Sequence, residues 1–308
     1  MIPTETIIIA GPTGAGKTDL SLRLAKALGG EIVGADAFQI YRGLPVLTAQ
    51  PSAHELAQIP HHLVASVDPS EAYDAGRYQR EALPILKAIV ARGNRPIVVG
   101  GTGLYVKALL GGLNPLPPSS PELRLGWGRM SLPELVTRLR ELDSDAPGMI
   151  DLANRRRVER ALEIVQLTGK PLAASRTGSP RPPSGVRSLF VTRERGELNA
   201  RIDANVAKMF VSGVEAEVAA LPEEKTGPTA SMTLGLQDVR SLLRGECSRA
   251  EAIASIGSMT RRYAKRQMTW FRHQHDFPIL NLSHFPEADQ DFTEADQDFT
   301  EALRLLAV

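Results

Sequence analysis

The chain has 308 residues, of which 43% are hydrophobic and 23% are charged, and its formal net charge is +1. This composition is typical of a globular protein with a sizeable core, in one large domain or two smaller ones. The small net charge excludes a uniformly basic surface, so a nucleic-acid binder with this sequence must cluster its positive charge.

Residues 6–10 form a short β-branched run that ends in a glycine-rich turn, which predicts a buried strand. Residues 19–28 carry leucines at helical spacing, and the two glycines that follow stop this helix. Residues 31–35 predict a second strand, which ends at Asp36. This strand–loop–helix–strand unit is typical of the start of an α/β domain with a parallel sheet.

Further along the chain, residues 73–92 predict a helix with a kink near Pro84. Residues 96–99 form a compact apolar run, which predicts a buried strand, and a second glycine-rich turn follows it. Residues 104–110 then resume a helical pattern.

Two stretches rich in Pro and Ser or Gly, residues 114–121 and 177–185, mark breaks in the chain. Between them, residues 121–169 show helical periodicity and no strand. Since residues 11–18 also fit the phosphate-loop pattern G-x-x-x-x-G-K-[ST], the sequence predicts an α/β fold, with a P-loop NTPase-like parallel sheet core and an all-helical insertion domain. The expected boundaries are residues 1–115 and 186–308 for the core and residues 116–185 for the insertion.

After the insertion, residues 186–192 predict a strand that returns to the sheet. Helices are expected over residues 195–220 and 248–275, and a last short strand over residues 278–282.

A seven-residue sequence, Glu-Ala-Asp-Gln-Asp-Phe-Thr, occurs twice in a row at residues 287–293 and 294–300. Two copies are too few for a solenoid. We interpret them as a local duplication in an acidic surface tail and assign them no function.

The single cysteine, Cys247, excludes an internal disulfide and a cysteine-rich zinc site. It fits a reducing compartment, and we expect a cytoplasmic location. The chain has no run of about twenty apolar residues and no basic segment at its start, so we expect neither a membrane span nor a signal peptide.

The turn after the first strand fits the pattern G-x-x-x-x-G-K-[ST] and lies between a predicted strand and a predicted helix. Glycines allow backbone N–H groups to close around phosphate oxygens, and the helix N-terminus favours an anion. The lysine supplies a mobile positive charge, and the threonine hydroxyl can ligate Mg²⁺. The predicted diphosphate-binding residues are Gly11, Pro12, Thr13, Gly14, Ala15, Gly16, Lys17 and Thr18, with Thr18 as the metal ligand.

A hydrolytic P-loop enzyme usually also has an apolar strand that ends in a metal-binding Asp. The best candidate strand, residues 96–99, ends in Gly100 and Gly101 instead, and residues 64–68 with Asp68 are a weaker substitute. This weakens the ATPase and kinase interpretations without excluding them.

Asp36 and Thr102 each follow a predicted parallel strand, so both should face the same crevice as the phosphate loop. The Asp36 carboxylate could accept a proton from a nucleophile or orient Mg²⁺, and Thr102 could hydrogen-bond a transferring oxygen. Each residue could instead cap a turn or a helix. His61 and His62 are adjacent and would face opposite sides of a strand, so a hydrogen-bonded histidine is favoured over a metal site.

Two basic runs are candidates for anion binding. Residues 154–160 lie in the expected insertion, and residues 261–272 lie on the long C-terminal helix and contain no acidic residue. Helical spacing puts Arg261, Lys265 and Arg272 near one stripe, with Arg262 and Arg266 beside it. Interleaved aromatic residues suit phosphate contact combined with stacking on a base or within the core.

In this order, these motifs resemble the bacterial tRNA dimethylallyltransferases over most of the chain. The resemblance is carried by the segments at residues 11–18, 35–42, 60–63, 100–105, 157–163 and 262–271. It implies a dimethylallyl diphosphate donor, Mg²⁺, and the anticodon stem-loop of tRNA as partner. The acceptor would be the exocyclic N6 of an adenine next to the anticodon, flipped out of its stack.

The resemblance also implies roles for particular residues. Asp36, Thr102, Lys17 and Arg201 would be catalytic, with Asp36 taking or holding the proton of the amine. The implied tRNA contacts are Asp36, Ala37, Phe38, Gln39, Thr102, Arg124, Arg156, Arg157, Arg160, Arg261, Lys265 and Arg266.

We therefore expect a monomeric tRNA prenyltransferase without membrane attachment. The main alternative is a P-loop small-molecule kinase, which would require a metal-binding Asp at the end of a core strand. A third interpretation, an RNA-binding ATP switch without enzymatic activity, would explain the basic helix but leave Asp36 and Thr102 without a role.

Overall fold

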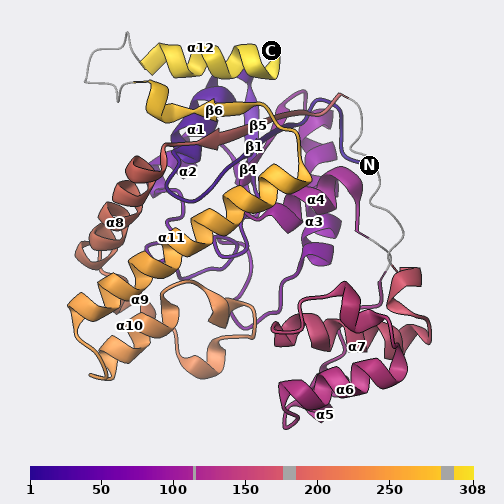
Figure 1. The fold of residues 1–308 in the computed structure, drawn as a ribbon. Helices are drawn as coiled ribbons and strands as arrows, with labels where there is room; N and C mark the ends of the chain where they lie inside the picture. The colour runs from indigo at the N-terminus through magenta and orange to yellow at the C-terminus, as the bar shows by residue number, and fades with distance from the viewer. Residues whose placement is uncertain (114–115, 176–184, 286–294) are drawn as a thin grey trace. The chain divides into compact units, whose positions relative to one another are not determined.

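In a computed structural model, the structure describes residues 1–113, 116–175, 185–285 and 295–308 (Figure 1). The chain divides into two compact units. One unit comprises Met1–Leu110 and Pro182–Val308, and the other comprises Gly111–Arg181.

The first unit is built on a six-stranded sheet with the order β3-β2-β4-β1-β5-β6, in which all neighbouring strands are parallel. The predicted strands and the parallel α/β core are thus confirmed. The strands are β1 (Ile7–Ala10), β2 (Gly30–Gly34), β3 (His61–His62), β4 (Arg95–Gly100), β5 (Arg187–Thr192) and β6 (Ile279–Asn281).

The register brings the carboxyl ends of the three central strands to one level. Ala10 of β1 pairs with Gly100 of β4, and Gly34 of β2 pairs with Val99 of β4. The loops that follow these strands therefore emerge side by side at one edge of the sheet, where ligands bind in open α/β folds.

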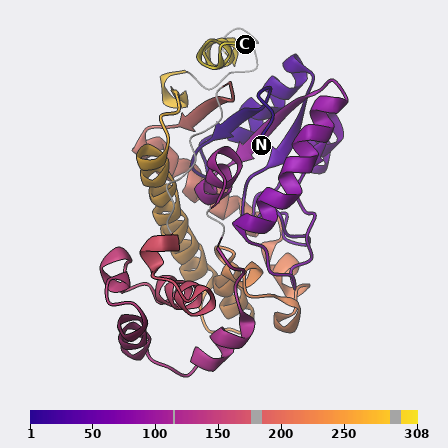
Figure 2. The same cartoon turned by 90° about the vertical axis from the view of Figure 1, so that its right-hand side faces the viewer.

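Strand β1 is fully buried, because helices cover both faces of the sheet. Ile7 and Ile9 belong to a core cluster that includes Leu20 and Leu24 of α1 (Lys17–Leu28). Helix α3 (Ala75–Ala91) packs against β2 and β4 and continues through Pro84 without a break. Figure 2 shows α3 along one side of the sheet and α11 (Arg249–Gln274) along the other.

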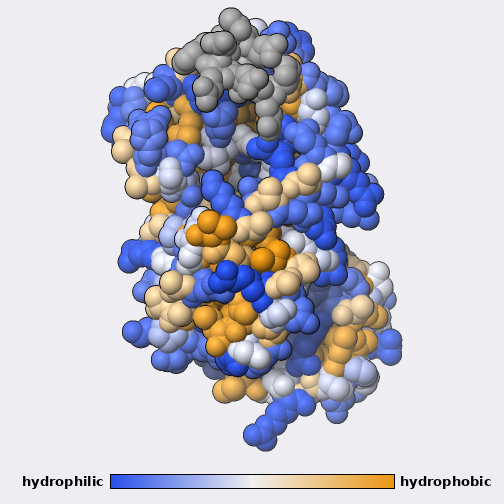
Figure 3. Space-filling model, turned by 90° about the vertical axis from the view of Figure 1, so that its left-hand side faces the viewer, coloured by the Kyte–Doolittle hydropathy of each residue, from blue (hydrophilic) through white to orange (hydrophobic). Residues whose placement is uncertain are grey.

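One predicted element of this unit is wrong, because residues 195–220 form two helices, α8 (Arg195–Val211) and α9 (Val214–Ala219). They separate at Gly213, whose φ of 88° lies in the left-handed region that ends a helix. A second core cluster joins them to α10 (Leu236–Leu243) and α11. Figure 3 shows the side of the molecule where α8 and α9 lie, with apolar residues gathered near the middle of a mostly hydrophilic face.

The acidic segment near the C-terminus differs from our expectation of a surface tail. The described part of its second copy begins helix α12 (Ala295–Leu306), which lies beside β6 (Figure 1). Ala302 and Leu306 are buried in the core cluster of the sheet. The Asp298 carboxylate accepts two hydrogen bonds from Arg23, at 2.9 and 2.6 Å. The apolar face of the helix thus docks it on the sheet. The first copy, residues 287–293, lies outside the described residues.

The second unit is helical, and its described residues contain no strand, as predicted for residues 121–169. Its main helices are α5 (Pro121–Trp127), α6 (Leu132–Leu142) and α7 (Arg155–Thr168). Leu135 and Leu139 of α6 pack against Val158 and Leu162 of α7.

Glu31 on β2 is a buried carboxylate that links three segments of the first unit. It accepts hydrogen bonds from Arg92 at 2.7 Å, from Asn94 at 2.8 Å and from the His62 ring at 2.7 Å. Burial opposes its ionisation, but these hydrogen bonds outweigh burial and lower the pKa of Glu31 to about 2. His62 is therefore a hydrogen-bonded histidine, as the sequence analysis favoured.

We expect Glu31→Gln to lower the free energy of unfolding by about 3 kcal/mol at pH 7, because a pKa shift of this size is stabilising where the carboxylate is ionised. A carboxylate with a lowered folded-state pKa stabilises fully above its unfolded pKa. The difference between wild type and variant should therefore be constant above about pH 4.5 and shrink as the pH falls toward 2. Urea unfolding across this pH range measures it. The exposed Glu224→Gln is the control, and an equal loss in both variants would contradict the prediction.

Candidate functional site

The phosphate loop, residues 11–18, connects β1 to α1, which begins at Lys17. Gly14 and Gly16 have φ values of 81° and 100°, in the region that only glycine adopts easily. A Cβ atom at Gly11 would lie 2.2 Å from the carbonyl oxygen of Val191. The glycines predicted from the motif are therefore required by the loop conformation and by its close packing on β5.

Lys17 folds back over this loop. Its Nζ donates a hydrogen bond of 2.8 Å to the carbonyl oxygen of Pro12. Burial lowers the pKa of Lys17 to about 8, while the charge of Asp36 acts in the opposite direction. The electrostatic coupling shows that the two predicted catalytic residues lie in one site. Lys17 therefore still carries its charge at neutral pH and loses it above about pH 8.

The loops after β2 and β4 touch through their backbones. Ala35 donates its N–H to the carbonyl of Val99 at 2.8 Å, and Thr102 donates its N–H to the carbonyl of Ala35 at 3.1 Å. A Cβ atom at Gly100 would lie 2.1 Å from the Ala35 carbonyl oxygen, so only glycine fits there. The Thr102 hydroxyl accepts a hydrogen bond of 2.9 Å from the Ala37 amide. Asp36 is held between these contacts.

Asp36 shapes its own turn with one carboxylate oxygen, while the other makes no hydrogen bond to the described residues. Its Oδ1 accepts hydrogen bonds from the amides of Phe38 at 2.9 Å and Gln39 at 3.3 Å. Its Oδ2 takes part in neither bond, and the residue is only partly buried. The capping role and the proton-accepting role considered from the sequence are therefore compatible, because they use different oxygens.

The aromatic side chain of Tyr263, which belongs to α11, lies near Asp36 and packs beside Phe38 of the Asp36 loop. The rings of Tyr263 and Phe38 are 6.1 Å apart, and the Arg266 guanidinium lies 5.6 Å from the centre of the Tyr263 ring. Burial, and then the charge of Asp36, raise the pKa of Tyr263, so it remains a neutral phenol. A neutral aromatic surface beside a carboxylate suits a planar base.

Gln267 joins two of the loops, and the sequence analysis gave it no role. Its Oε1 accepts from the Thr13 amide at 3.0 Å, and its Nε2 donates to the Gly101 carbonyl at 3.0 Å. The side chain is buried. A signal for it was available, because Ala264, Gln267 and Phe271 share the buried face of α11, and a polar residue on a buried face needs partners.

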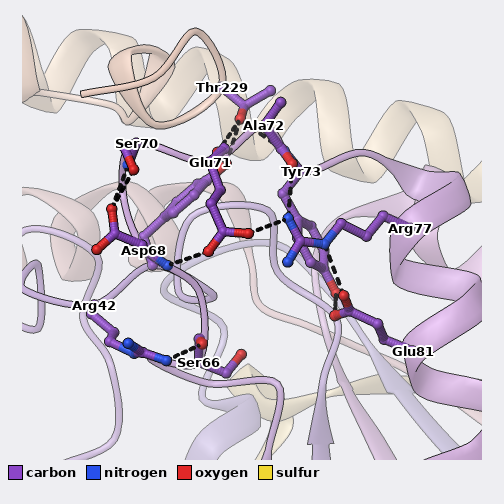
Figure 4. Close-up of polar contacts among 11 residues, drawn as sticks. Arg42, Ser66, Asp68, Ser70, Glu71, Ala72, Tyr73, Arg77, Glu81 and Thr229 are labelled. Carbon is purple, nitrogen blue, oxygen red and sulfur yellow. Dashed lines mark hydrogen bonds and ion pairs between the residues drawn. The ribbon is translucent and has the colours of Figure 1, made fainter. Parts of the chain in front are cut away.

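A second polar network holds the far end of the Asp36 loop. The hydroxyl of the buried Tyr41 is hydrogen-bonded to the hydroxyl of Thr229, which also accepts from the Tyr73 amide at 3.1 Å. Figure 4 shows how this network continues through Arg77, whose guanidinium binds Glu71 and Glu81. Hydrogen bonds therefore hold the Asp36 loop at both of its ends.

Gln39, a predicted tRNA contact, also stabilises a neighbouring loop, because its Nε2 donates to the carbonyls of Thr48 and Ala49, at 3.1 and 2.7 Å. The weaker candidate for a strand that ends in a metal-binding Asp is wrong. Asp68 does not end a core strand. Its carboxylate accepts from the Ser70 amide at 2.9 Å within a turn (Figure 4).

Two arginines near the start of α8 support the phosphate loop from its carbonyl side. The Nε of Arg201 donates to the Gly14 carbonyl at 3.2 Å, and the Nε of Arg193 donates to the Ala15 carbonyl at the same distance. Arg201 was predicted as a catalytic residue, whereas Arg193 was missed, because no local motif marks it.

The predicted tRNA-contacting arginines separate into two groups. In the helical unit, Arg124 and Arg160 both bind the buried carboxylate of Glu163, at 2.6 and 3.1 Å, whereas Arg156 and Arg157 are exposed. On α11, Arg261 pairs with Asp203 of α8. Lys265 and Arg266 are exposed there, as are Arg262 and Arg272.

Within the described ranges, no group of three or more His, Cys, Asp or Glu side chains could hold a metal ion. Thr18 therefore remains the predicted ligand, with its hydroxyl at the start of α1. Helices long and apolar enough to cross a membrane are also absent from the described part of the chain.

Two family models match the chain. The model described as IPP transferase matches residues 39–274, and the one described as isopentenyl transferase matches residues 4–66. The first covers well over half of the chain.

Among curated relatives, tRNA dimethylallyltransferase 1 of Citrifermentans bemidjiense is 42% identical over 278 residues, covering 88% of this chain and 90% of that protein. The tRNA dimethylallyltransferase of Caulobacter sp. is 43% identical over 282 residues, covering 89% and 91%.

Solved structures of tRNA-modifying transferases also resemble this chain. The tRNA isopentenylpyrophosphate transferase of Bacillus halodurans superposes with a TM-score of 0.69 at 32% identity, covering 98% of this chain and 97% of the other. A eukaryotic dimethylallyltransferase, solved acting on tRNA, gives a TM-score of 0.80 at 27% identity and covers 97% of this chain and 77% of the other.

The lowered pKa of Lys17 predicts a pH dependence of anion binding. The affinity for inorganic diphosphate should weaken above about pH 8, by up to about tenfold per pH unit, because the lysine loses its proton there. Calorimetric titrations from pH 7 to 9.5 measure this. Lys17→Arg is the matched control, since arginine stays charged and corrects for the ionisation of diphosphate itself. A parallel decline in both proteins would contradict the assignment.

Proposed function

Since the chain belongs to the tRNA dimethylallyltransferase family, we propose that it prenylates tRNA. It transfers a dimethylallyl group from dimethylallyl diphosphate to the exocyclic N6 of the adenine 3′-adjacent to the anticodon. The products are N6-dimethylallyladenosine and diphosphate. The observation that carries this proposal is the joining of the phosphate loop to the loops that hold Asp36, since Gln267 binds both Thr13 and Gly101 and Thr102 binds the Ala37 amide.

In the proposed reaction, the N6 amine attacks C1 of the dimethylallyl group, and the bond from C1 to the diphosphate oxygen breaks. Asp36 accepts the proton that the amine loses, through the oxygen not used in its turn. Thr102 holds the turn beside it and lies within reach of the reacting groups. Lys17 and Arg201 neutralise the charge that develops on the leaving diphosphate.

The donor binds in the phosphate loop, where the amides of residues 11–18 surround its phosphates. The hydroxyl of Thr18 fits Mg²⁺, which prefers oxygen ligands and usually keeps substrate phosphates and water as the others. Bound Mg²⁺ would neutralise phosphate charge. Gln267 binds both Thr13 and Gly101 and so holds the phosphate loop next to the loop that follows β4.

The adenine has to leave its stack to reach Asp36. We propose that it packs beside Phe38 and Tyr263, next to the backbone of Ala37. The exposed cations Arg156, Arg157, Lys265 and Arg266 contact the tRNA backbone. Gln39, Arg124, Arg160 and Arg261 are proposed tRNA contacts as well, and their side chains also bind other groups of the protein.

The helical insertion, residues 116–185, supplies part of the tRNA-binding surface in this proposal. We propose that the protein acts as a monomer. It works in the cytoplasm, where tRNA is modified.

The alternative of a small-molecule kinase has little support. Among the described strands, β1, β4 and β5 end in Ala10, Gly100 and Thr192, none of which can hold a metal as an aspartate does. The named relatives also do not favour it. An ATP switch without enzymatic activity would not explain why Asp36 and Thr102 are held beside the phosphate loop.

A direct assay tests the proposal. The purified protein is incubated with undermodified tRNA, labelled dimethylallyl diphosphate and Mg²⁺, and label in the tRNA is measured. Nuclease digestion then identifies the modified nucleoside. The same protein with labelled ATP tests phosphate transfer. If the protein binds tRNA but no label appears in the tRNA, the proposal is overturned.

We expect Asp36→Asn to lower the rate of transfer by about 10²- to 10⁴-fold, because it removes the proton acceptor. Asparagine keeps an Oδ1 that can accept from Phe38 and Gln39, so the turn and the affinity for tRNA should remain. Single-turnover kinetics and tRNA binding are measured side by side, with Asp68→Asn as the control. Loss of tRNA binding in Asp36→Asn would show that the residue acts through the fold.

A further inference from the structure

Arg193 lies directly after β5, and its side chain is only 9% exposed. Its Nε donates to the Ala15 carbonyl in the phosphate loop, and its guanidinium also pairs with Glu197. A Cβ atom at Gly16 would lie 3.7 Å from its terminal nitrogen. The positive charge of Arg193 thus lies beside the phosphate loop, on the side of its carbonyl groups.

A residue from the C-terminal part of the chain fixes Glu197 in turn. The Ser283 hydroxyl donates to Glu197 and accepts from the Glu194 amide at 2.8 Å. Ser283 lies in η5 (Leu282–His284), just after β6, and the Leu282 side chain would lie 3.2 Å from a Cβ at Gly16. The segment after β6 therefore supports the phosphate loop from behind.

The peptide between Ala15 and Gly16 explains why this support matters. In a trans peptide the C=O and N–H point in opposite directions, so fixing the Ala15 carbonyl also fixes the direction of the Gly16 N–H. Glycines flank Ala15 on both sides and allow this peptide to rotate. An external hydrogen bond is needed to keep that N–H turned toward a bound phosphate.

We propose that Arg193, Glu197 and Ser283 form a brace that sets the Gly16 amide for diphosphate binding, with Arg193 as the positioning residue. The inference rests on the proposed function only in naming diphosphate as the anion. The brace lines an open cavity of about 560 Å³ together with Arg201 and Phe285. Water can therefore solvate the groups that a substitution leaves without partners, and the variants should fold.

The test compares Arg193→Met and Ser283→Ala with two exposed controls, Lys208→Met on α8 and Ser255→Ala on α11. The Kd for inorganic diphosphate at fixed Mg²⁺ is measured by calorimetry, with KM values for both substrates. Arg193→Met should raise the diphosphate Kd and the KM for dimethylallyl diphosphate about tenfold, as for one lost charge-assisted hydrogen bond. Ser283→Ala should raise them about threefold. The KM for tRNA should not change in Arg193→Met or Ser283→Ala. The melting temperatures of the two control variants should not change either.

Arg193→Lys separates geometry from charge. A lysine keeps the charge but lacks the planar fork that reaches Ala15 and Glu197 together, so it should recover less than half of the lost affinity in free-energy terms. Full recovery would overturn the brace in favour of simple charge. An unchanged diphosphate Kd in Arg193→Met, or an equal rise in the KM for tRNA, would overturn it as well. A wild-type protein that binds diphosphate but transfers no prenyl group would refute the proposed function and leave the brace standing.

Discussion

The site depends on the close approach of two backbones at the carboxyl edge of the sheet. Gly100 lies so near the Ala35 carbonyl that no side chain fits between them. This contact lets the β2 and β4 loops share hydrogen bonds, since Thr102 binds Ala35 through its amide and Ala37 through its hydroxyl. Asp36 is fixed between these two residues. A larger residue at position 100 would separate the loops and move the carboxylate away from Lys17.

Helix α11 completes this arrangement from the far end of the sequence. Gln267 binds Thr13 and Gly101, and Trp270 packs where a Cβ at Gly103 would lie only 2.1 Å from its ring. The opposite face of the helix carries exposed cations. One helix therefore both fixes the loops and presents positive charge, which explains why its motif mixes apolar, aromatic and basic residues. The positive charge is concentrated on this helix, which is consistent with a formal net charge of only +1 for the whole chain.

The parts that the sequence predicted best are those set by local spacing. The strands, the phosphate loop and Asp36 follow from short patterns whose backbone requirements are the same in any fold. Partners distant in the chain escaped prediction. Glu163 binds Arg124 and Arg160, and Asp203 binds Arg261, although each arginine looks like a free cation in its own run. Helix α12 was likewise missed, because acidic composition concealed an apolar face that docks on the sheet.

The placement of Asp36 beside Lys17 also suits the movement of charge in the proposed reaction. As the amine attacks, its proton passes to Asp36 and cancels one negative charge there. At the same time, cleavage of the bond from carbon to oxygen adds one negative charge to the departing diphosphate. The total charge of the site stays constant, while the negative charge shifts from the carboxylate to the phosphate loop. Lys17, which Asp36 helps to keep protonated in the free protein, can then bind the leaving group at full charge.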